Sequence, residues 1–270
     1  MLENPRSPRV RAVAKLAKRS ARDETGSFLL EGPQAVSEAI RYRPEGVLEL
    51  YATPTAVERH PAVREAAEAA GIEVQFAAEN VIEAMSDTVT PQGIVAVARQ
   101  FPTALKDVLA ERPRLLAICE EVRDPGNLGT IIRAADAAGA DAVLLTGRTV
   151  DPFHPKVVRA TTGSLFHVAV SRAGDLQDVV PAVEAAGLRI IAADVKGEDL
   201  LAARSRGMLA EPTAWLFGNE ARGLSDESLE LVSTVLRLPI YGAAESLNLA
   251  TAASVCLYES AFAQRAADPS

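Results

Sequence analysis

Three loops of the chain carry polar residues whose types and spacing can support chemistry. The first loop reads from Glu120 to Thr130 and leads into an apolar stretch that contains Arg133. Asn127 in this loop has a side-chain amide that both donates and accepts hydrogen bonds. If the following helix opens at Gly129, Arg133 lies about one turn inside it, and its guanidinium reaches toward a phosphate at the helix N-terminus. The alternative for Arg133 alone is an exposed, solvated charge.

The second loop begins at Gly218, directly after an apolar strand-like stretch. A glycine there permits a ligand to approach the backbone closely. Ser225 is typical of a helix N-cap, which explains the end of this loop without any ligand. Capping does not explain Glu220. A carboxylate at this position can hold a cationic centre or pair with Arg133 or Arg222.

The third loop runs from Leu238 to Ala250. Ser246 is positioned to cap the last helix, and Asn248 is then expected to point into a cleft. A capped helix with small packing residues is the equally good structural alternative for this loop taken alone. All three loops follow predicted strands, and ligands of parallel α/β sheets collect at the carboxyl ends of strands.

Several common sites are excluded by their missing signatures. The first loop lacks the GxGxxG spacing of dinucleotide-binding sheets, and the chain contains no GxxxxGK[ST] phosphate loop. Cys119 and Cys256 are isolated among apolar neighbours, which predicts reduced core residues and neither a disulfide framework nor a zinc spacing. The three histidines stand in no metal-binding pattern, so no metal site is expected.

Apolar periodicity predicts alternating strands and helices in both halves of the chain. In the first half, strands are expected at 28–32, 47–51, 72–76 and 94–98, and helices at 10–22, 33–41, 60–70 and 80–85. In the second half, strands are expected at 115–119, 142–145, 166–170, 190–193, 214–217 and 235–238, and helices at 129–138, 179–186 and 246–264. Continuous apolar strands favour a buried parallel sheet.

The fold class is therefore α/β with two domains. We expect a basic N-terminal arm and a small α/β domain over residues 1–98, a linker over 99–113, and a larger domain over 114–270. Two prolines around a polar stretch mark the linker.

Charge is distributed unevenly along the 270 residues, whose net charge is −8. Residues 1–22 hold seven basic residues and one acid, a local charge of +6 that leaves −14 for the remainder. This basic arm is either a solvated terminus or an RNA-contacting element. The chain lacks an apolar signal region and a stretch long enough to span a bilayer, so we expect a cytoplasmic protein with no membrane partner.

Together, the three loops resemble motifs 1, 2 and 3 of the SpoU (TrmH-type) RNA 2′-O-methyltransferases of the SPOUT superfamily, in order and spacing. The resemblance covers Leu115 to about Gln264, and the segments 28–32 and 92–96 resemble parts of the family's substrate-binding domain. It implies a trefoil-knotted parallel sheet, a homodimer, S-adenosylmethionine as methyl donor, and a ribose 2′-hydroxyl as acceptor. The resemblance of the appended domain favours ribosomal RNA over transfer RNA as the substrate.

The resemblance also implies roles for particular residues. The expected catalytic group is Asn127, Arg133, Glu220, Ser246 and Asn248. The expected cofactor-binding group is Leu216, Gly218, Leu238, Ile240 and Leu247, mainly through their backbone. Because a guanidinium with a pKa above about 12 is a poor general base, we expect Arg133 to bind the phosphate beside the target ribose and to stabilise alkoxide character.

Three alternatives remain open at this point. A transfer RNA ribose methyltransferase shares the same motifs. A non-catalytic RNA- or ribosome-binding protein that keeps the fold is disfavoured by the intact polar residues of the motifs. A nucleotide-dependent oxidoreductase on a Rossmann-like sheet is disfavoured by the missing glycine fingerprint.

Overall fold

The computed structural model describes residues 1–267, and the chain forms two compact units. Unit 1 comprises residues 1–101 together with 151–167, and unit 2 comprises residues 102–150 together with those from 168 onward. The domain boundaries expected from the sequence place segment 151–167 within the second domain. The structure groups this segment with the N-terminal residues because its side chains pair with partners there.

Unit 1 contains a four-stranded sheet in the order β1-β4-β2-β3. Strands β1 (Ser27–Glu31) and β2 (Val47–Ala52) pair antiparallel with β4 (Ile94–Arg99), and β3 (Val74–Phe76) pairs parallel with β2. The strand positions predicted from the sequence are confirmed. The strands carry mainly apolar side chains at the centre of the sheet. Burial of these side chains against the surrounding helices stabilises the sheet.

Short helices cover this sheet, and several begin with proline at the first helical position, where its missing N–H costs nothing. They are α1 (Pro8–Lys15), α2 (Arg19–Thr25), α3 (Pro33–Tyr42), α4 (Pro54–Arg59), α5 (Pro61–Ala69), α6 (Glu79–Met85) and α9 (Pro155–Thr161). The single basic helix expected at 10–22 is in fact α1 and α2. Lys18 is extended between them, and Arg22 donates to the carbonyl oxygens of Leu16 and Ala17 at the end of α1.

Segment 151–167 is bound to the rest of unit 1 by ion pairs and aromatic packing. Arg22 Nε and Asp151 Oδ2 are 2.7 Å apart and both side chains are almost fully buried. Phe153 packs against Phe28 of β1 with ring centroids 4.8 Å apart. Arg159 of α9 contacts the Glu31 carboxylate. No local pattern in the segment signals these partners.

Unit 2 is built on a six-stranded, entirely parallel sheet in the order β10-β8-β9-β5-β6-β7. Its strands are β5 (Leu115–Glu120), β6 (Ala142–Thr146), β7 (Ala169–Gly174), β8 (Arg189–Asp199), β9 (Thr213–Phe217) and β10 (Thr234–Arg237). The predicted parallel α/β class is confirmed. The strand expected at 166–170 begins later because Ser164–Phe166 forms a 3₁₀ turn.

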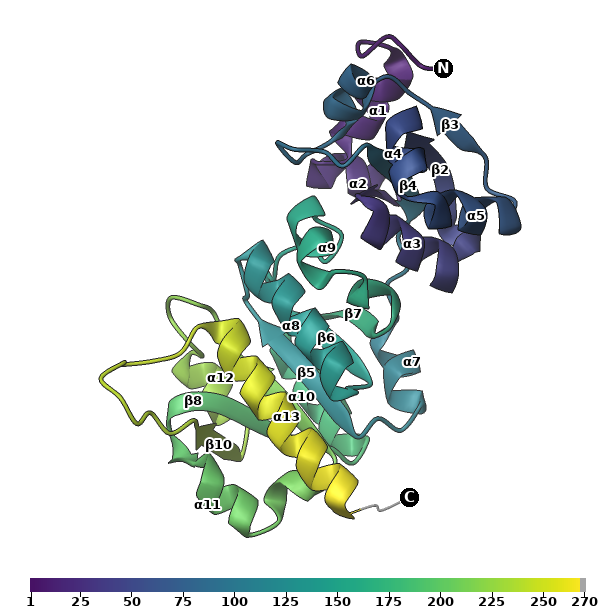
Figure 1. Ribbon diagram of the computed structural model, residues 1–270. Coiled ribbons are helices and arrows are strands. Elements are labelled where there is room, and N and C mark those ends of the chain that lie inside the picture. The colour runs from purple at the N-terminus through teal and green to yellow at the C-terminus, as the bar shows by residue number, and fades with distance from the viewer. Residues whose placement is uncertain (268–270) are drawn as a thin grey trace. The chain divides into compact units, whose positions relative to one another are not determined.

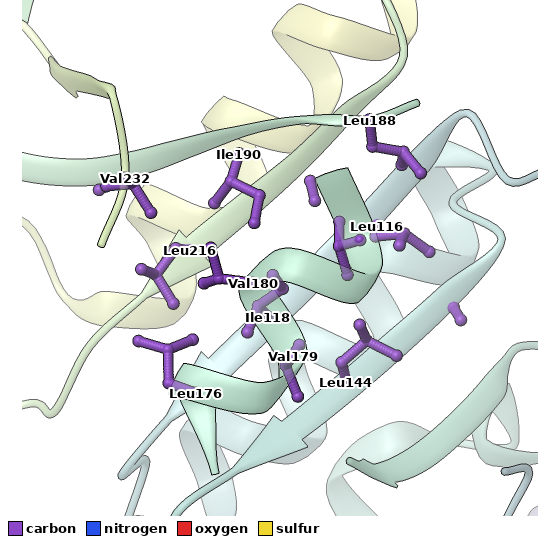
Figure 2. Close-up of a cluster of buried hydrophobic side chains, with 14 of the residues drawn as sticks. Leu116, Ile118, Leu144, Leu176, Val179, Val180, Leu188, Ile190, Leu216 and Val232 are labelled. Carbon is purple, nitrogen blue, oxygen red and sulfur yellow. The ribbon is translucent and has the colours of Figure 1, made fainter. Parts of the chain in front are cut away.

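Helices cover both faces of this sheet. On one face, α10 (Leu176–Ala185) packs on apolar strand residues, as Figure 2 shows for Leu116, Ile118 and Leu144. Helix α7 (Leu105–Ala110) adds Val108 to the same apolar cluster. On the other, α13 (Leu249–Ala267) lies along α8 (Pro125–Ala138), yellow beside teal in Figure 1. Trp215 of β9 is buried there and donates to Ser260 of α13 at 2.9 Å. Two short helices, α11 (Leu200–Ser205) and α12 (Asp226–Glu230), complete the unit.

The segment expected to be a linker is partly folded into unit 2. Helix α7 occupies its centre, and Val108 is only 4% exposed within the core of unit 2. Burial of one apolar face of the helix explains why this polar stretch is ordered.

Cys119 and Cys256 are both buried and unpaired, as the sequence indicated. Burial, together with the nearby Glu220 charge, raises the pKa of the Cys119 thiol to about 12. Across residues 1–267, no helix has the length and apolar character needed to cross a membrane.

Candidate functional site

Three of the five expected catalytic residues are joined by hydrogen bonds in unit 2. Asn127 donates through Nδ2 to Glu220 Oε1 at 3.2 Å. Asn248 donates through Nδ2 to Asn127 Oδ1 at 3.0 Å. The three residues come from α8, from the loop after β9 and from the N-terminus of α13. The loops after β5 and β9 therefore meet the last helix at the carboxyl edge of the sheet.

Helix α8 begins earlier than the sequence analysis expected. Asp124 is its N-cap, and Asp124 Oδ1 accepts the N–H of Asn127 at 2.9 Å, while Pro125 occupies the first helical position. The expectation that Gly129 opens the helix is wrong, because the aspartate–proline pair satisfies the capping requirement four residues earlier. Asn127 therefore lies in the first turn, and Arg133 lies about two turns inside the helix.

Glu220 anchors the first loop through its carboxylate. Oε2 accepts the N–H of Arg123 at 3.1 Å, and Oε1 accepts the N–H of Asp124 at 2.9 Å. Partial burial acts to raise the pKa of Glu220, but these backbone hydrogen bonds and the Asn127 amide outweigh it and hold the pKa below its ordinary value. An ionised carboxylate with occupied lone pairs is suited to positioning the loop and unsuited to accepting a proton.

The loop after β9 closes on itself between Asn219 and Gly223, which exchange two backbone hydrogen bonds of 3.1 and 2.8 Å. A Cβ on Gly218 would lie 2.6 Å from the carbonyl carbon of Gly223, so only glycine fits there. The Asn219 side chain donates to the carbonyl oxygen of Glu121 at 2.9 Å. These contacts fix the turn that carries Glu220.

A second carboxylate, Glu120, lies at the end of β5 beside a cavity of about 320 Å³. Ser228 of α12 donates to Glu120 Oε1 at 2.9 Å. Burial raises the pKa of Glu120, and the neighbouring Glu121 charge acts in the same direction, although the Ser228 hydrogen bond opposes them. Arg222 also lines this cavity. Glu120 and Glu220 thus have pKa values displaced in opposite directions at the ends of adjacent strands.

The remaining two expected catalytic residues are not part of the hydrogen-bonded group. Arg133 is exposed, and within residues 1–267 its guanidinium forms no ion pair. Ser246 is exposed in the loop before α13 and does not cap that helix. Asn248 takes the capping role, because its Oδ1 accepts the N–H groups of Ala250 and Thr251.

The expected cofactor-binding residues occupy two different environments. Leu216 and Gly218 are buried in and directly after β9. Ile240 and Leu247 are 38% and 41% exposed in the loop after β10, and Leu238 is half-buried there. In the described part of the chain, the main chain of residues 239–247 makes no backbone hydrogen bond. Its N–H and C=O groups are therefore available to a ligand.

Three further residues organise the site and were not expected from the sequence: Asp124, Asn219 and Glu121. An aspartate directly before proline is a strong helix-start signal, and it would have identified Asp124. Asn219 forms an Asx-type turn, with Oδ1 accepting the N–H of Ala221 at 3.0 Å, and asparagine after glycine is typical of such turns. Glu121 has a positive φ of 55°, which no sequence signal reveals.

Two family models match the chain in succession. The model of the SpoU rRNA Methylase family matches residues 114–258. A model described as RNA 2'-O ribose methyltransferase substrate binding matches residues 29–104. A relative from Bacillus subtilis, named 23S rRNA (guanosine(2553)-2'-O)-methyltransferase RlmP, is 35% identical, with 95% of this chain and 97% of the relative covered. The 23S rRNA (uridine(2479)-2'-O)-methyltransferase of Streptomyces viridochromogenes is 32% identical, with 91% and 86% covered.

Solved structures give the same result. The AdoMet-bound rRNA methyltransferase of Sinorhizobium meliloti superimposes with a TM-score of 0.83 at 33% identity, covering 100% of this chain and 98% of that one. The SpoU methyltransferase AviRb of Streptomyces viridochromogenes, in complex with the cofactor AdoMet, gives 0.81 at 29% identity, covering 95% and 98%. The matched models, the relatives and the motif geometry agree, and the chain belongs to the SpoU rRNA methylase family.

Proposed function

We propose that this protein transfers a methyl group from S-adenosylmethionine to a ribose 2′-hydroxyl of ribosomal RNA. The observation that carries the proposal is the hydrogen-bonded group Glu220–Asn127–Asn248, which gathers three motif residues at the carboxyl edge of a parallel sheet. The relatives named above as 23S rRNA 2'-O-methyltransferases support ribosomal RNA as the substrate class.

S-adenosylmethionine fits the residues present in unit 2. The unbonded main chain of residues 239–247 offers donors and acceptors for the adenine and ribose, and the exposed Ile240 and Leu247 offer apolar surface. The backbone of Leu238 and Gly218 belongs to the same expected cofactor-binding group. Leu216 is buried in β9, the strand that precedes Gly218. When bound, the cofactor supplies an electrophilic methyl group on a positively charged sulfur.

The chain's own residues then have to align and activate the RNA. In the transfer, a bond forms between the 2′-oxygen and the methyl carbon, the sulfur–carbon bond breaks, and the hydroxyl proton leaves to a phosphate oxygen or water. Arg133 is exposed and unpaired in residues 1–267, so it is free to bind the phosphate beside the ribose and to stabilise alkoxide character. Asn127 and Asn248 hold the surrounding loops, and Ser246 lies in the loop next to them.

A homodimer is also part of the proposal. Helix α13 exposes Val255, Tyr258 and Phe262 at 39%, 36% and 56%, spaced so that they share one face. Apolar residues gathered on one exposed helix face are suited to a second copy of the chain. The trefoil knot and the cytoplasmic location expected from the sequence remain part of this proposal as well.

The test is transfer of labelled methyl from S-adenosylmethionine to RNA from a strain that lacks the protein, with products mapped by 2′-O-methyl-sensitive sequencing. We expect one labelled ribose in the large ribosomal RNA. Label in transfer RNA alone would favour the transfer RNA enzyme. Binding of ribosomal RNA without binding of S-adenosylmethionine would favour the non-catalytic alternative. An Asn127→Ala variant serves as the inactive control.

A further inference from the structure

The seven basic residues of the N-terminal arm divide into two groups. Three have acidic partners: Arg22 pairs with buried Asp151, Arg9 with Glu49 and Arg19 with Asp23. The other four are exposed and form no ion pair within residues 1–267; these are Arg6, Arg11, Lys15 and Lys18. The arm is therefore partly a structural element and partly a set of free cations.

Helix α1 holds two of the free cations on a rigid surface. Val10 and Val13 are 1% and 3% exposed, and with Leu16 they pack into an apolar cluster that includes Tyr51 and Ile82. Arg11 and Lys15 are four residues apart, so they share the opposite face of the helix, about 6 Å apart along its axis. Burial of this apolar seam shows that α1 is packed on unit 1 and is not a frayed terminus.

The charge of the remaining chain makes these cations more significant. Residues after the arm carry a net charge of −14, which repels a polyanion. RNA binding depends on cations placed against phosphates, and each such contact releases counterions. Acids are abundant in the chain, yet none of the described acids pairs with Arg11 or Lys15.

We propose that the α1 basic face, defined as Arg11 and Lys15 with the adjacent Arg6 and Lys18, binds phosphates of the substrate RNA backbone. This inference rests on the proposed function and extends it, because residues 1–28 lie outside both matched family models. Backbone contacts carry no sequence information, so the α1 basic face increases affinity and leaves the choice of the methylated nucleotide unchanged. Its location on a helix packed into the core lowers the entropic cost of binding.

The test uses the full-length double variant Arg11→Gln/Lys15→Gln and 23S ribosomal RNA from a strain lacking the protein as the probe. The control, Arg64→Gln/Arg206→Gln, removes the same charge from cations that pair with Glu68 and Glu198. Binding is measured from 50 to 300 mM salt. Each lost phosphate contact makes the slope of log affinity against log salt shallower by ~0.7–0.9. For two lost contacts we expect the slope of the α1 variant to become shallower by about 1.4 to 1.8, and that of the control to change little.

Methyl transfer separates this inference from the proposed function. The α1 variant is expected to raise KM for RNA several-fold while KM for S-adenosylmethionine and the mapped ribose stay the same. A wild-type salt slope in the α1 variant, or an equal change in the control, overturns the inference while methylation by the wild-type protein still supports the proposed function. The inference is also overturned if the α1 variant loses binding to anionic phospholipid vesicles while its binding to RNA is unchanged. Absence of methylation by wild-type protein instead contradicts the proposed function.

Discussion

Asn248 donates a hydrogen bond to Asn127 across 3.0 Å, although 121 residues separate them in the chain. Asn248 Oδ1 is occupied by the N–H groups of α13, so its Nδ2 is left to donate. Asn127 then accepts through Oδ1 and donates through Nδ2 to Glu220. The orientation of both amides is thereby determined. The first turns of α8 and α13 are locked to one carboxylate.

The first prediction concerns this chain of hydrogen bonds. Asn127→Asp places a second carboxylate against Glu220 Oε1, now 3.2 Å from the Asn127 amide nitrogen. Like charges at this distance repel, and the donor between them is lost. We expect kcat to fall by about 100-fold, on the scale of a lost preorganised donor, and the Tm to decrease. Steady-state methyl transfer and thermal unfolding measure the two effects. Wild-type turnover would show that the amide does not organise the site.

The second prediction compares Glu220→Gln with Glu120→Gln. The pKa of Glu220 is lower in the folded protein than its ordinary value of 4.5. The ionised carboxylate therefore stabilises the fold at pH values above 4.5, and this stabilisation is lost as the pH falls through the lowered pKa. The pKa of Glu120 is raised mainly by burial, so its ionisation destabilises the fold as the pH rises above 4.5 through the raised pKa.

At pH 7, Glu220→Gln is therefore expected to lower the Tm, and Glu120→Gln to raise it. Both differences from the wild type should shrink as the pH is lowered below 4.5. Gln at 120 keeps an oxygen that accepts from Ser228, so that substitution removes mainly the charge. Gln at 220 also replaces one of the two oxygens that accept the N–H groups of Arg123 and Asp124, which adds to the expected loss. Scanning calorimetry between pH 3.5 and 8 makes the measurement. Shifts of the same sign in the two variants would contradict the opposite pKa displacements.

The sequence predicted the elements of the sheet well because buried strands are continuous apolar runs, as in 115–119 and 214–217. It predicted the three motif loops from their polar residues. The start of α8 expected at Gly129 is wrong because Asp124 caps the helix and Pro125 begins it four residues earlier. The sequence did not place segment 151–167 with the N-terminal residues, because Asp151 pairs with Arg22 at a separation of 129 residues, and no local pattern encodes such a contact.

The third prediction concerns the tight turn after β9. In Gly218→Ala, the new Cβ would meet the backbone of Gly223 at 2.6 Å, and backbone atoms cannot move aside as a flexible side chain does. Such overpacking costs about 1–3 kcal/mol and displaces the loop that carries Glu220. We expect S-adenosylmethionine affinity, measured by calorimetry, to fall at least about tenfold.

Gly46→Ala is the matched control for this change. The nearest atom to its Cβ would be that of Arg43 at an ordinary 3.8 Å, and Gly46 lies in unit 1. Affinity for S-adenosylmethionine should stay at the wild-type level in the control. An equal loss in both variants would show that the close approach of Gly218 to Gly223 is not responsible.

The last prediction concerns the buried ion pair that holds segment 151–167 within unit 1. Asp151→Asn removes the charge that compensates Arg22, whose side chain is 1% exposed and 2.7 Å from Asp151. A buried cation left without its counter-charge destabilises a fold by about 3–5 kcal/mol, whereas the exposed Arg64–Glu68 pair contributes at most about 1 kcal/mol. Denaturant unfolding should therefore show a large loss for Asp151→Asn and a small one for Glu68→Gln. Because the pair can be replaced by apolar side chains, Arg22→Met/Asp151→Leu should recover part of the loss. If the double variant were as unstable as Asp151→Asn, the loss of stability would be caused by changed packing and not by the unpaired charge of Arg22.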